Sequence, residues 1–408
     1  MVRPRVLDLG GEEGAKRAFG GGLARRASLG LNAAVALQLR LSAPGAAPLH
    51  LFPQDSGGES PACLDGSQYG AYLRPSPAGS HKWTVFIEGG GWCWNEESCY
   101  ERSKTTKGSS RKWPEEMKCM CWNVKPDKSF DSRCNCVRLN YGDGASFSGA
   151  RPEPWPVPGR EGSELYFRGR RNLDAAVDFM LAKGLGEATE LVLVGQSAGG
   201  LAVFLHSDRI AQRLAAEAPK ARVRAVAIGG LFLDDSGISH PGPSYASEMR
   251  NIARMQNITL AHLGASAASC ADAHPGAEHL CLVSSHMAGF VETPLFLFNS
   301  KYDGWQLNAI LRSRRPARVA EYGEAFLQQL QPFRTKPQHG AFITSCVCHG
   351  GCPWRELRLA GKNSLAHYRD WYVRNASGGA VTFVVDNRSL NGDGQLPAKN
   401  CKRLGRTV

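Results

Sequence analysis

The apolar residues of this chain gather in short runs that alternate with longer stretches of helical spacing. Strands are predicted for the short runs, at 83–87, 137–141, 191–194, 222–228 and 295–298. Helices are predicted where apolar positions follow helical spacing, at 171–183, 244–255 and 318–330. The run Leu191-Val192-Leu193-Val194 has no polar position, which is typical of a parallel strand buried on both faces. This alternation predicts an α/β fold, with a mostly parallel sheet that helices cover on both faces.

Residues 1–58 differ in composition from the rest of the chain. They are rich in Gly, Ala and Arg and hold few aromatic residues, which predicts a leader or a disordered N-terminal arm. The length of 408 residues is enough for one enlarged domain or for two, and we predict a single domain over residues 59–408. No run of about eighteen apolar residues occurs, so stable insertion into a membrane is not expected.

The charge balance narrows the class of partner. Lys and Arg number 49 and Asp and Glu number 37, which gives a formal net charge of +12. Such a surplus favours an anionic partner, which could be nucleic acid, a membrane surface or an acidic polysaccharide. The basic residues are scattered and form no stripe interleaved with aromatic residues, so nucleic acid is not the expected partner.

Thirteen cysteines indicate that the chain matures in an oxidising compartment, because a reducing cytosol seldom holds so many in an ordinary enzyme. The odd number leaves one thiol free or paired between chains. Three N-x-S/T sequons fit a secretory route, at Asn257, Asn375 and Asn387. The partly apolar stretch 29–41 is interrupted by polar residues, and an Arg-rich transit peptide fits the N-terminus nearly as well as a signal peptide. Secretion is therefore predicted from the cysteines.

The segment Gly195-Gln196-Ser197-Ala198-Gly199 directly follows the apolar run 191–194, and a stretch of helical spacing follows it. A G-x-S-x-G pattern between a strand and a helix is typical of the nucleophile elbow of α/β-hydrolases. The elbow holds its serine in a strained turn, and flanking glycines allow the close backbone approach that this turn requires. A Gly-rich turn with a capping serine is the structural alternative. The context favours Ser197 as the nucleophile of an α/β-hydrolase-like enzyme.

A second Gly-rich segment, Glu88-Gly89-Gly90-Gly91-Trp92, directly follows the predicted strand 83–87. Acyl transfer passes through a tetrahedral oxyanion that needs preorganised N–H donors. In α/β-hydrolases one donor is the residue after the nucleophile, here Ala198, and another comes from a loop after an earlier strand. Gly90 and Gly91 are the donors predicted in that loop. A flexible turn or a phosphate-binding loop are the alternatives, but no Lys-Ser/Thr pair or Rossmann spacing is present.

The chain order in this enzyme class is serine, then acid, then histidine. Asp303 lies just past the apolar run 295–298, where the acid is expected, although an ordinary turn aspartate would also fit there. Three histidines follow it: His339, His349 and His367. His367 lies in a polar, helix-like stretch and is predicted to be a surface residue. Chain order leaves His339 and His349 as alternatives for the base.

These motifs resemble the pectin acetylesterase family, which also includes the Notum carboxylesterases. The similar segments run in family order: 63–67, 87–93 with Cys99 and 108–110, 166–169, 197–202, 302–306, and 340–346 followed by His349. The resemblance favours His349 over His339 as the catalytic base. It implies hydrolysis of O-acetyl esters on cell-wall pectin, without a metal or a cofactor.

The chain departs from the plant members of this family at three positions. Gly142 stands where the plant enzymes commonly have a cysteine, so we expect Cys63 to lack that partner. Residue 196 is Gln, and Gly350 directly follows His349, where plant members commonly have cysteines.

Two C-x-C pairs, at Cys119/Cys121 and Cys134/Cys136, form what looks like a local insertion. Four cysteines could bind zinc, but structural zinc sites usually use a longer spacing, C-x₂₋₄-C. Disulfides are therefore favoured over zinc for these pairs. Elsewhere, the two bridges that enclose short loops are predicted to be Cys93–Cys99 and Cys270–Cys281.

The motifs and the resemblance together predict a secreted serine esterase that acts on an acetylated acidic polysaccharide. The positive charge would help to bind a polygalacturonate chain, with rates that fall as salt is added. One alternative is a Notum-like enzyme that removes a longer acyl group from protein, which would need a deep apolar pocket. Another is an inactive carbohydrate-binding relative. The segment 302–306 favours the pectin branch, and the intact Ser, Asp and His set argues against inactivity.

Overall fold

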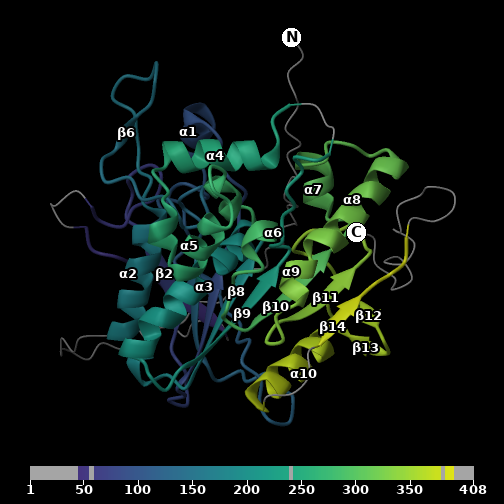
Figure 1. The fold of residues 1–408 in the computed structure, drawn as a ribbon. Coiled ribbons are helices and arrows are strands. Elements are labelled where there is room, and N and C mark those ends of the chain that lie inside the picture. The colour runs from purple at the N-terminus through teal and green to yellow at the C-terminus, as the bar shows by residue number, and fades with distance from the viewer. Residues whose placement is uncertain (1–44, 55–58, 239–241, 378–381, 390–408) are drawn as a thin grey trace, which may run out of the picture. The chain divides into compact units, whose positions relative to one another are not determined.

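The computed structural model describes residues 45–54, 59–238, 242–377 and 382–389. Ten strands within this part of the chain form one sheet (Figure 1). They are β1 (Ala46–Leu51), β2 (Gly70–Arg74), β3 (Lys82–Ile87), β4 (Glu116–Lys118), β5 (Asn135–Leu139), β8 (Glu190–Gln196), β9 (Arg222–Ile228), β10 (Leu295–Ser300), β11 (Gly340–Thr344) and β14 (Phe383–Val385). Two small ribbons pair β6 (Trp155–Pro156) with β7 (Glu164–Leu165) and β12 (Arg358–Leu359) with β13 (Lys362–Asn363).

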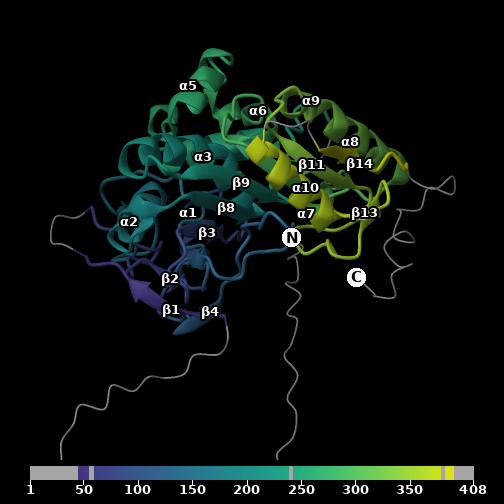
Figure 2. The same cartoon turned by 90° about the horizontal axis from the view of Figure 1, so that it is seen from below.

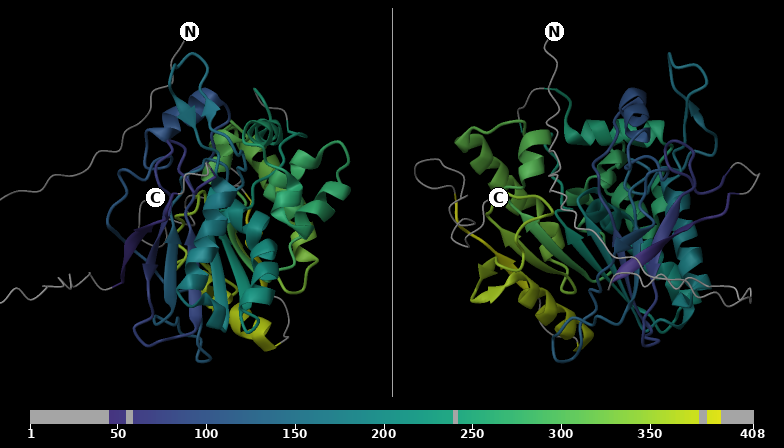
Figure 3. Two further views of the ribbon diagram at one scale, coloured as in Figure 1. Left: turned by 90° about the vertical axis from the view of Figure 1, so that its left-hand side faces the viewer. Right: turned by 180° about the vertical axis from the view of Figure 1, so that it is seen from behind.

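The sheet has the order β14-β11-β10-β9-β8-β3-β5-β2-β1-β4. The strands from β14 to β5 pair in parallel, and those from β5 to β4 pair antiparallel. The right panel of Figure 3 shows β1 (purple) and the C-terminal strand (yellow) towards opposite ends of the sheet. Each strand and helix predicted from the sequence has a counterpart in this fold.

Ten α-helices and three 3₁₀-helices lie in the described part of the chain. The α-helices are α1 (Glu96–Ser103), α2 (Gly169–Ala182), α3 (Ala198–Glu217), α4 (Tyr245–Met255), α5 (Ala265–Asp272), α6 (Ser284–Met287), α7 (Gly304–Ala309), α8 (Pro316–Gln329), α9 (Gln331–Arg334) and α10 (Ser364–Ser377). The 3₁₀-helices are η1 (Leu185–Glu187), η2 (Leu260–Leu263) and η3 (Glu278–Leu282). None of these helices has the length and apolar character needed to cross a membrane.

Both faces of the parallel strands are buried, because alternate side chains of one strand point to opposite faces. Leu191 and Leu193 of β8 belong to a core cluster that includes residues of α2, α3 and α8. Val192 and Val194 belong to a second cluster, with residues of α10. Helices therefore cover both faces of the sheet, as predicted. Figure 2 shows the sheet and these helices from below. This double burial is why the run 191–194 has no polar position.

Strand β1 lies within the segment that was predicted to be a leader or a disordered arm, so that prediction is wrong for residues 46–51. Residues 1–44 and 55–58 of that segment lie outside the described residues. The first half of β1 pairs with β4 and the second half with β2. Pro48, which has no N–H to donate, lies where the pairing changes partner. The strand is held by this pairing and not by an apolar pattern, which is why composition failed to indicate it.

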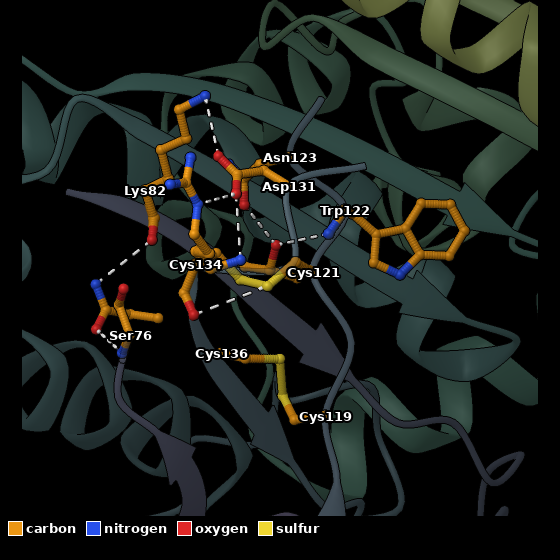
Figure 4. The surroundings of a disulfide bond; sticks show 12 residues. Ser76, Lys82, Cys119, Cys121, Trp122, Asn123, Asp131, Cys134 and Cys136 are labelled. Atoms are coloured by element: carbon orange, nitrogen blue, oxygen red, sulfur yellow. Dashed lines mark hydrogen bonds and ion pairs between the residues drawn. A yellow bond between two sulfur atoms is a disulfide. The ribbon is translucent and has the colours of Figure 1, made fainter. Parts of the chain in front are cut away.

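Five disulfides join cysteines of the described residues, which fits an extracellular protein. The predicted bridges Cys93–Cys99 and Cys270–Cys281 are both formed. The two C-x-C pairs are joined crosswise, as Cys119–Cys136 and Cys121–Cys134 (Figure 4), and so form disulfides rather than a zinc site. They attach the segment after β4 to β5. The fifth, Cys348–Cys352, closes a short loop that follows β11.

Cys63 is a free, buried cysteine, and burial raises the pKa of its thiol. A Cβ atom added at Gly142 would lie 2.9 Å from the sulfur of Cys63. In a disulfide, the Cβ of one cysteine lies roughly 3 Å from the sulfur of the other. Residue 142 therefore lies within disulfide distance of Cys63.

We predict that Gly142→Cys forms a disulfide with Cys63 and raises the free energy of unfolding by about 2–4 kcal/mol. Urea unfolding measures the gain, and thiol titration of the denatured variant should find one thiol fewer than in the wild type. In a Cys63→Ser background the same substitution only crowds the site, which costs about 1–3 kcal/mol. One thiol more than in the wild type, together with lower stability, would show that the backbone does not allow the bond.

Candidate active site

Ser197 lies between β8 and α3 in a backbone conformation that non-glycine residues rarely adopt, with φ 57° and ψ −124°. Such a conformation costs on the order of 1–3 kcal/mol and persists only where the surroundings enforce it. A Cβ at Gly195 would lie 2.0 Å from the carbonyl oxygen of Gly199, and a Cβ at Gly199 would lie 2.2 Å from that of Ile87. The two glycines therefore let β8, α3 and β3 approach closely enough to hold the turn.

The imidazole of His349 lies between the hydroxyl of Ser197 and the carboxylate of Asp303. Its Nε2 is 2.7 Å from Ser197 Oγ, and its Nδ1 is 2.9 Å from Asp303 Oδ1 and 2.8 Å from Oδ2. Because a carboxylate can only accept, Nδ1–H donates to Asp303 and leaves Nε2 to accept from the serine. Asp303 is 1% exposed and the side chain of His349 is 20% exposed. The arrangement can take a proton from Ser197 at a site open to solvent on one side.

Each of these side chains follows the C-terminal end of a parallel strand. Ser197 follows β8, Asp303 follows β10 and His349 follows β11. Since parallel strands end at the same edge of a sheet, three segments far apart in sequence converge there. Asp303 also caps α7, because its Oδ1 accepts from the backbone N–H groups of Trp305 and Gln306, each at 3.0 Å. This capping fixes the carboxylate towards the imidazole.

The Gly-rich segment after β3 reaches the same edge and contacts the turn of Ser197. A Cβ at Gly89 would lie 2.2 Å from the carbonyl oxygen of Gln196, and Gly91 has a φ of 68° that favours glycine. No acceptor within the described residues pairs with the backbone N–H of Gly90, Gly91 or Ala198. These three amides are therefore available to donate to a ligand.

Two residues that the sequence analysis did not identify hold this loop in place. Arg102 of α1 donates to the carbonyl oxygens of Gly90 at 2.8 Å and of Trp92 at 3.0 Å. Ser146 accepts from Trp92 Nε1 at 2.9 Å and donates to the carbonyl oxygen of Ala198 at 2.7 Å. Ser146 itself has a positive φ of 53°. Neither residue belongs to a motif with fixed spacing, so only the folded chain reveals them.

Four aromatic side chains pack against one another beside the imidazole of His349. The ring of Trp92 contacts those of Phe232, Trp305 and Tyr245 edge-on, with centroid distances of 4.9, 5.4 and 5.5 Å. The rings of Trp305 and Phe232 lie 6.0 and 6.3 Å from the ring of His349. We call these four residues the aromatic wall. It makes one side of the site apolar and fills it with rings.

The other two downstream histidines lie away from Ser197. His339 is fully buried: its Nδ1 accepts from Leu295 N–H at 3.2 Å, and its Nε2–H donates to the carbonyl oxygen of Val291 at 3.1 Å. His367 is 6% exposed and donates to the carbonyl oxygen of Leu359 at 2.9 Å, so its prediction as a surface residue is wrong. The reason is that α10 packs on β11, which buries the helix face that carries His367.

One group of side chains has the composition of a metal site but not its chemistry. Ligand atoms of Cys270, His274 and Cys281 lie within 4.8 Å of one another. The two sulfur atoms are joined in a disulfide, so neither is a thiolate that could bind a metal. No residue of this trio lies in the site around Ser197.

Burial lowers the pKa of His339 to about 4, whereas an unfolded histidine has a pKa of about 6.5. Between about pH 6.5 and pH 4, the unfolded chain binds a proton at this histidine that the folded chain does not bind. The free energy of unfolding therefore decreases as the pH decreases, by up to about 1.4 kcal/mol per pH unit. We predict that His339→Gln loses less stability between pH 7 and pH 5 than the wild type, by about 2 kcal/mol. Urea unfolding at the two pH values measures this difference, with exposed His81→Gln as control. A wild-type pH dependence in His339→Gln would contradict the assignment.

Comparison with known proteins places most of the chain among esterases. Residues 46–378 match the family model described as pectinacetylesterase. Pectin acetylesterase 11 of Arabidopsis thaliana is 29% identical over 371 residues, which cover 82% of this chain and 89% of that protein. The human palmitoleoyl-protein carboxylesterase NOTUM is 35% identical over 186 residues, covering 44% of this chain and 36% of NOTUM. The solved structure of the Wnt deacylase Notum from Drosophila superposes with a TM-score of 0.70 at 25% identity, and covers 84% of this chain and 97% of that one.

Proposed function

The chain belongs to the pectin acetylesterase family and is a carboxylic ester hydrolase, and we propose that it removes O-acetyl groups from pectin with Ser197 as nucleophile. The observation that carries this proposal is the hydrogen-bonded series Ser197, His349, Asp303. Pectin, an acidic polysaccharide, also suits the net charge of +12. With five disulfides and this substrate, the proposed location is the cell wall or another extracellular site.

In the proposed mechanism, Ser197 Oγ attacks the carbonyl carbon of the acetyl ester while His349 Nε2 takes the hydroxyl proton. Asp303 keeps the proton on Nδ1 and stabilises the imidazolium that forms. The N–H groups of Gly90, Gly91 and Ala198 donate to the oxyanion. His349 then protonates the departing sugar hydroxyl, which leaves an acetyl-enzyme on Ser197. Water, activated by the same imidazole, hydrolyses that ester and restores the serine.

The aromatic wall favours an ester with a short acyl group as the substrate. A palmitoleoyl-type chain would need a deep apolar pocket beside Ser197, whereas Trp92, Phe232, Tyr245 and Trp305 are packed against one another at one side of His349. Phe232 is fully buried and Trp92 is 4% exposed, so neither ring is free to swing aside without losing its contacts. An acetyl group requires no such displacement.

We predict that Ser197→Ala lowers acetate release from acetylated pectin by about 10³-fold or more, because loss of a triad member removes the activated nucleophile. The matched control is Ser269→Ala, an exposed serine on α5, which should keep wild-type activity. A fluorophosphonate probe should label the wild type and the control but not Ser197→Ala. A loss of less than about tenfold on Ser197→Ala would rule out the assignment of the nucleophile, and an unlabelled wild type would favour an inactive relative.

We further predict that the wild type hydrolyses p-nitrophenyl acetate at least about 100-fold more efficiently than the palmitate, measured as kcat/KM, because the aromatic wall fills one side of the site with packed rings. Phe232→Ala should open the wall and shift this ratio towards the long ester by about tenfold or more. Phe130→Ala, which removes a ring of another cluster, is the control. Equal efficiency on both esters in the wild type would instead favour the Notum-like alternative.

A further inference from the structure

Three titratable side chains outside the proposed triad form a second hydrogen-bonded series. Asp234 follows β9, His274 follows α5, and His286 lies in α6. His286 Nε2 is 2.9 Å from Asp234 Oδ2, and His286 Nδ1 is 3.0 Å from His274 Nε2. The three residues border a cavity of about 590 Å³, and all are partly accessible to solvent. The esterase mechanism uses none of them.

In each imidazole, one nitrogen faces away from the other histidine and lies beside an acceptor, which determines that this nitrogen carries the hydrogen. Asp234 Oδ1 accepts hydrogen bonds from the backbone N–H of Ser236 at 2.9 Å and from the hydroxyl of Ser236, so the Asp234 side chain acts as an acceptor towards its neighbours. His286 Nε2 must therefore donate a proton to Asp234. On the other imidazole, His274 Nδ1 lies 2.8 Å from the carbonyl oxygen of Cys270 and must also donate.

The two remaining nitrogens, His274 Nε2 and His286 Nδ1, then face each other without a hydrogen. A neutral imidazole has one N–H, and in both residues it is already directed outwards. His274 Nε2 and His286 Nδ1 consequently present two lone pairs at 3.0 Å, with the ring planes nearly perpendicular at 86°. Two lone pairs at this distance repel unless the two nitrogens bind a cation together. That cation is either a proton or a metal ion.

We propose that His274 and His286 bind one divalent transition-metal ion of the Zn²⁺ class. Zinc bonds to imidazole nitrogen at about 2.0–2.1 Å with tetrahedral geometry, so two nitrogens on one ion lie roughly 3.3–3.4 Å apart. The observed spacing of 3.0 Å is a few tenths of an ångström shorter, so the two rings must separate slightly when the ion binds. Metal-binding histidines usually donate their other N–H to a carboxylate or a backbone carbonyl, and here Asp234 and the carbonyl of Cys270 accept these bonds. Mg²⁺ and Ca²⁺ prefer oxygen ligands and suit the pair poorly.

The adjoining cavity allows water molecules to complete the coordination of the ion. Two protein ligands form a weak site, so micromolar affinity is expected rather than the tight binding of a structural zinc centre. The ion would link the segment after α5 to α6. Ser285 of α6 donates through its backbone N–H to the carbonyl oxygen of Phe232 at 3.2 Å, so the link would also support the aromatic wall.

The test is isothermal titration of the full-length protein with Zn²⁺ near neutral pH, after removal of metals with a chelator. We expect one ion per chain with a micromolar dissociation constant, weakened at least about tenfold in both His274→Gln and His286→Gln. Exposed His81→Gln is the matched control and should bind as the wild type does. Asp234→Asn, which keeps the shape but removes the charge, should weaken binding by about 10–100-fold.

Thermal unfolding provides a second readout, because an ion that binds only the folded chain raises Tm. Added Zn²⁺ should raise the Tm of the wild type and of His81→Gln but not that of His274→Gln. Lack of Zn²⁺ binding by the wild type, or equal binding by His274→Gln and His81→Gln, would overturn the proposal and leave a shared proton as the cation. The assay does not use ester hydrolysis, so its result is independent of the proposed activity.

Discussion

The geometry of the site depends on how closely three backbone segments approach one another around Ser197. Gly195 at the end of β8, Gly199 in the first turn of α3 and the carbonyl of Ile87 at the end of β3 lie so close that no Cβ fits between them. This contact forces the positive φ of Ser197 and aims its hydroxyl away from the sheet. The strain is sustained because β8 is paired on both sides and buried on both faces. A side chain at either glycine would therefore displace the strand, the helix and the loop together.

Further constraints add to this contact from the loops at the same edge of the sheet. Arg102 and Ser146 hold the Gly-rich loop against the elbow, so the backbone of that loop is fixed before any substrate binds. The loop of His349 is closed by Cys348–Cys352, and the backbone N–H of Gly304 donates to the carbonyl oxygen of Cys348 at 3.2 Å. The segments of Asp303 and His349 are thus linked through the backbone as well as through the two side chains. Such preorganisation is what catalysis of acyl transfer by hydrogen-bond donors requires.

The sequence predicted the parts of the fold that local pattern controls. The parallel strands were recognisable because burial on both faces removes polar residues from them, and the elbow because its glycines have no substitute. Ser197 and Asp303 were selected by order and context, whereas order alone could not separate His349 from His339, and the family resemblance selected His349. Both histidines follow β10 in the chain, but the ring of His339 is bonded to the buried backbone of Val291 and Leu295, whereas that of His349 contacts Ser197 and Asp303.

What the sequence could not predict comes from long-range packing. Strand β1 owes its structure to its pairing partners, and His367 is buried because α10 lies on β11. Arg102, Ser146 and the aromatic wall reach the site from separate loops and helices, and no spacing rule connects them. The absence of a cysteine at Gly142 was visible in the sequence, but the unpaired state of Cys63 required the fold.

The account rests on Ser197 and His349 acting as one unit through the hydrogen bond between Nε2 and Oγ. The most direct test is the kcat for acetyl ester hydrolysis of Ser197→Ala, His349→Ala and the double variant. If the two residues form one unit, the double variant should lose about as much activity as either single variant, within roughly threefold. Losses that multiply in the double variant would show that the two residues contribute independently, and the proposed mechanism would be contradicted.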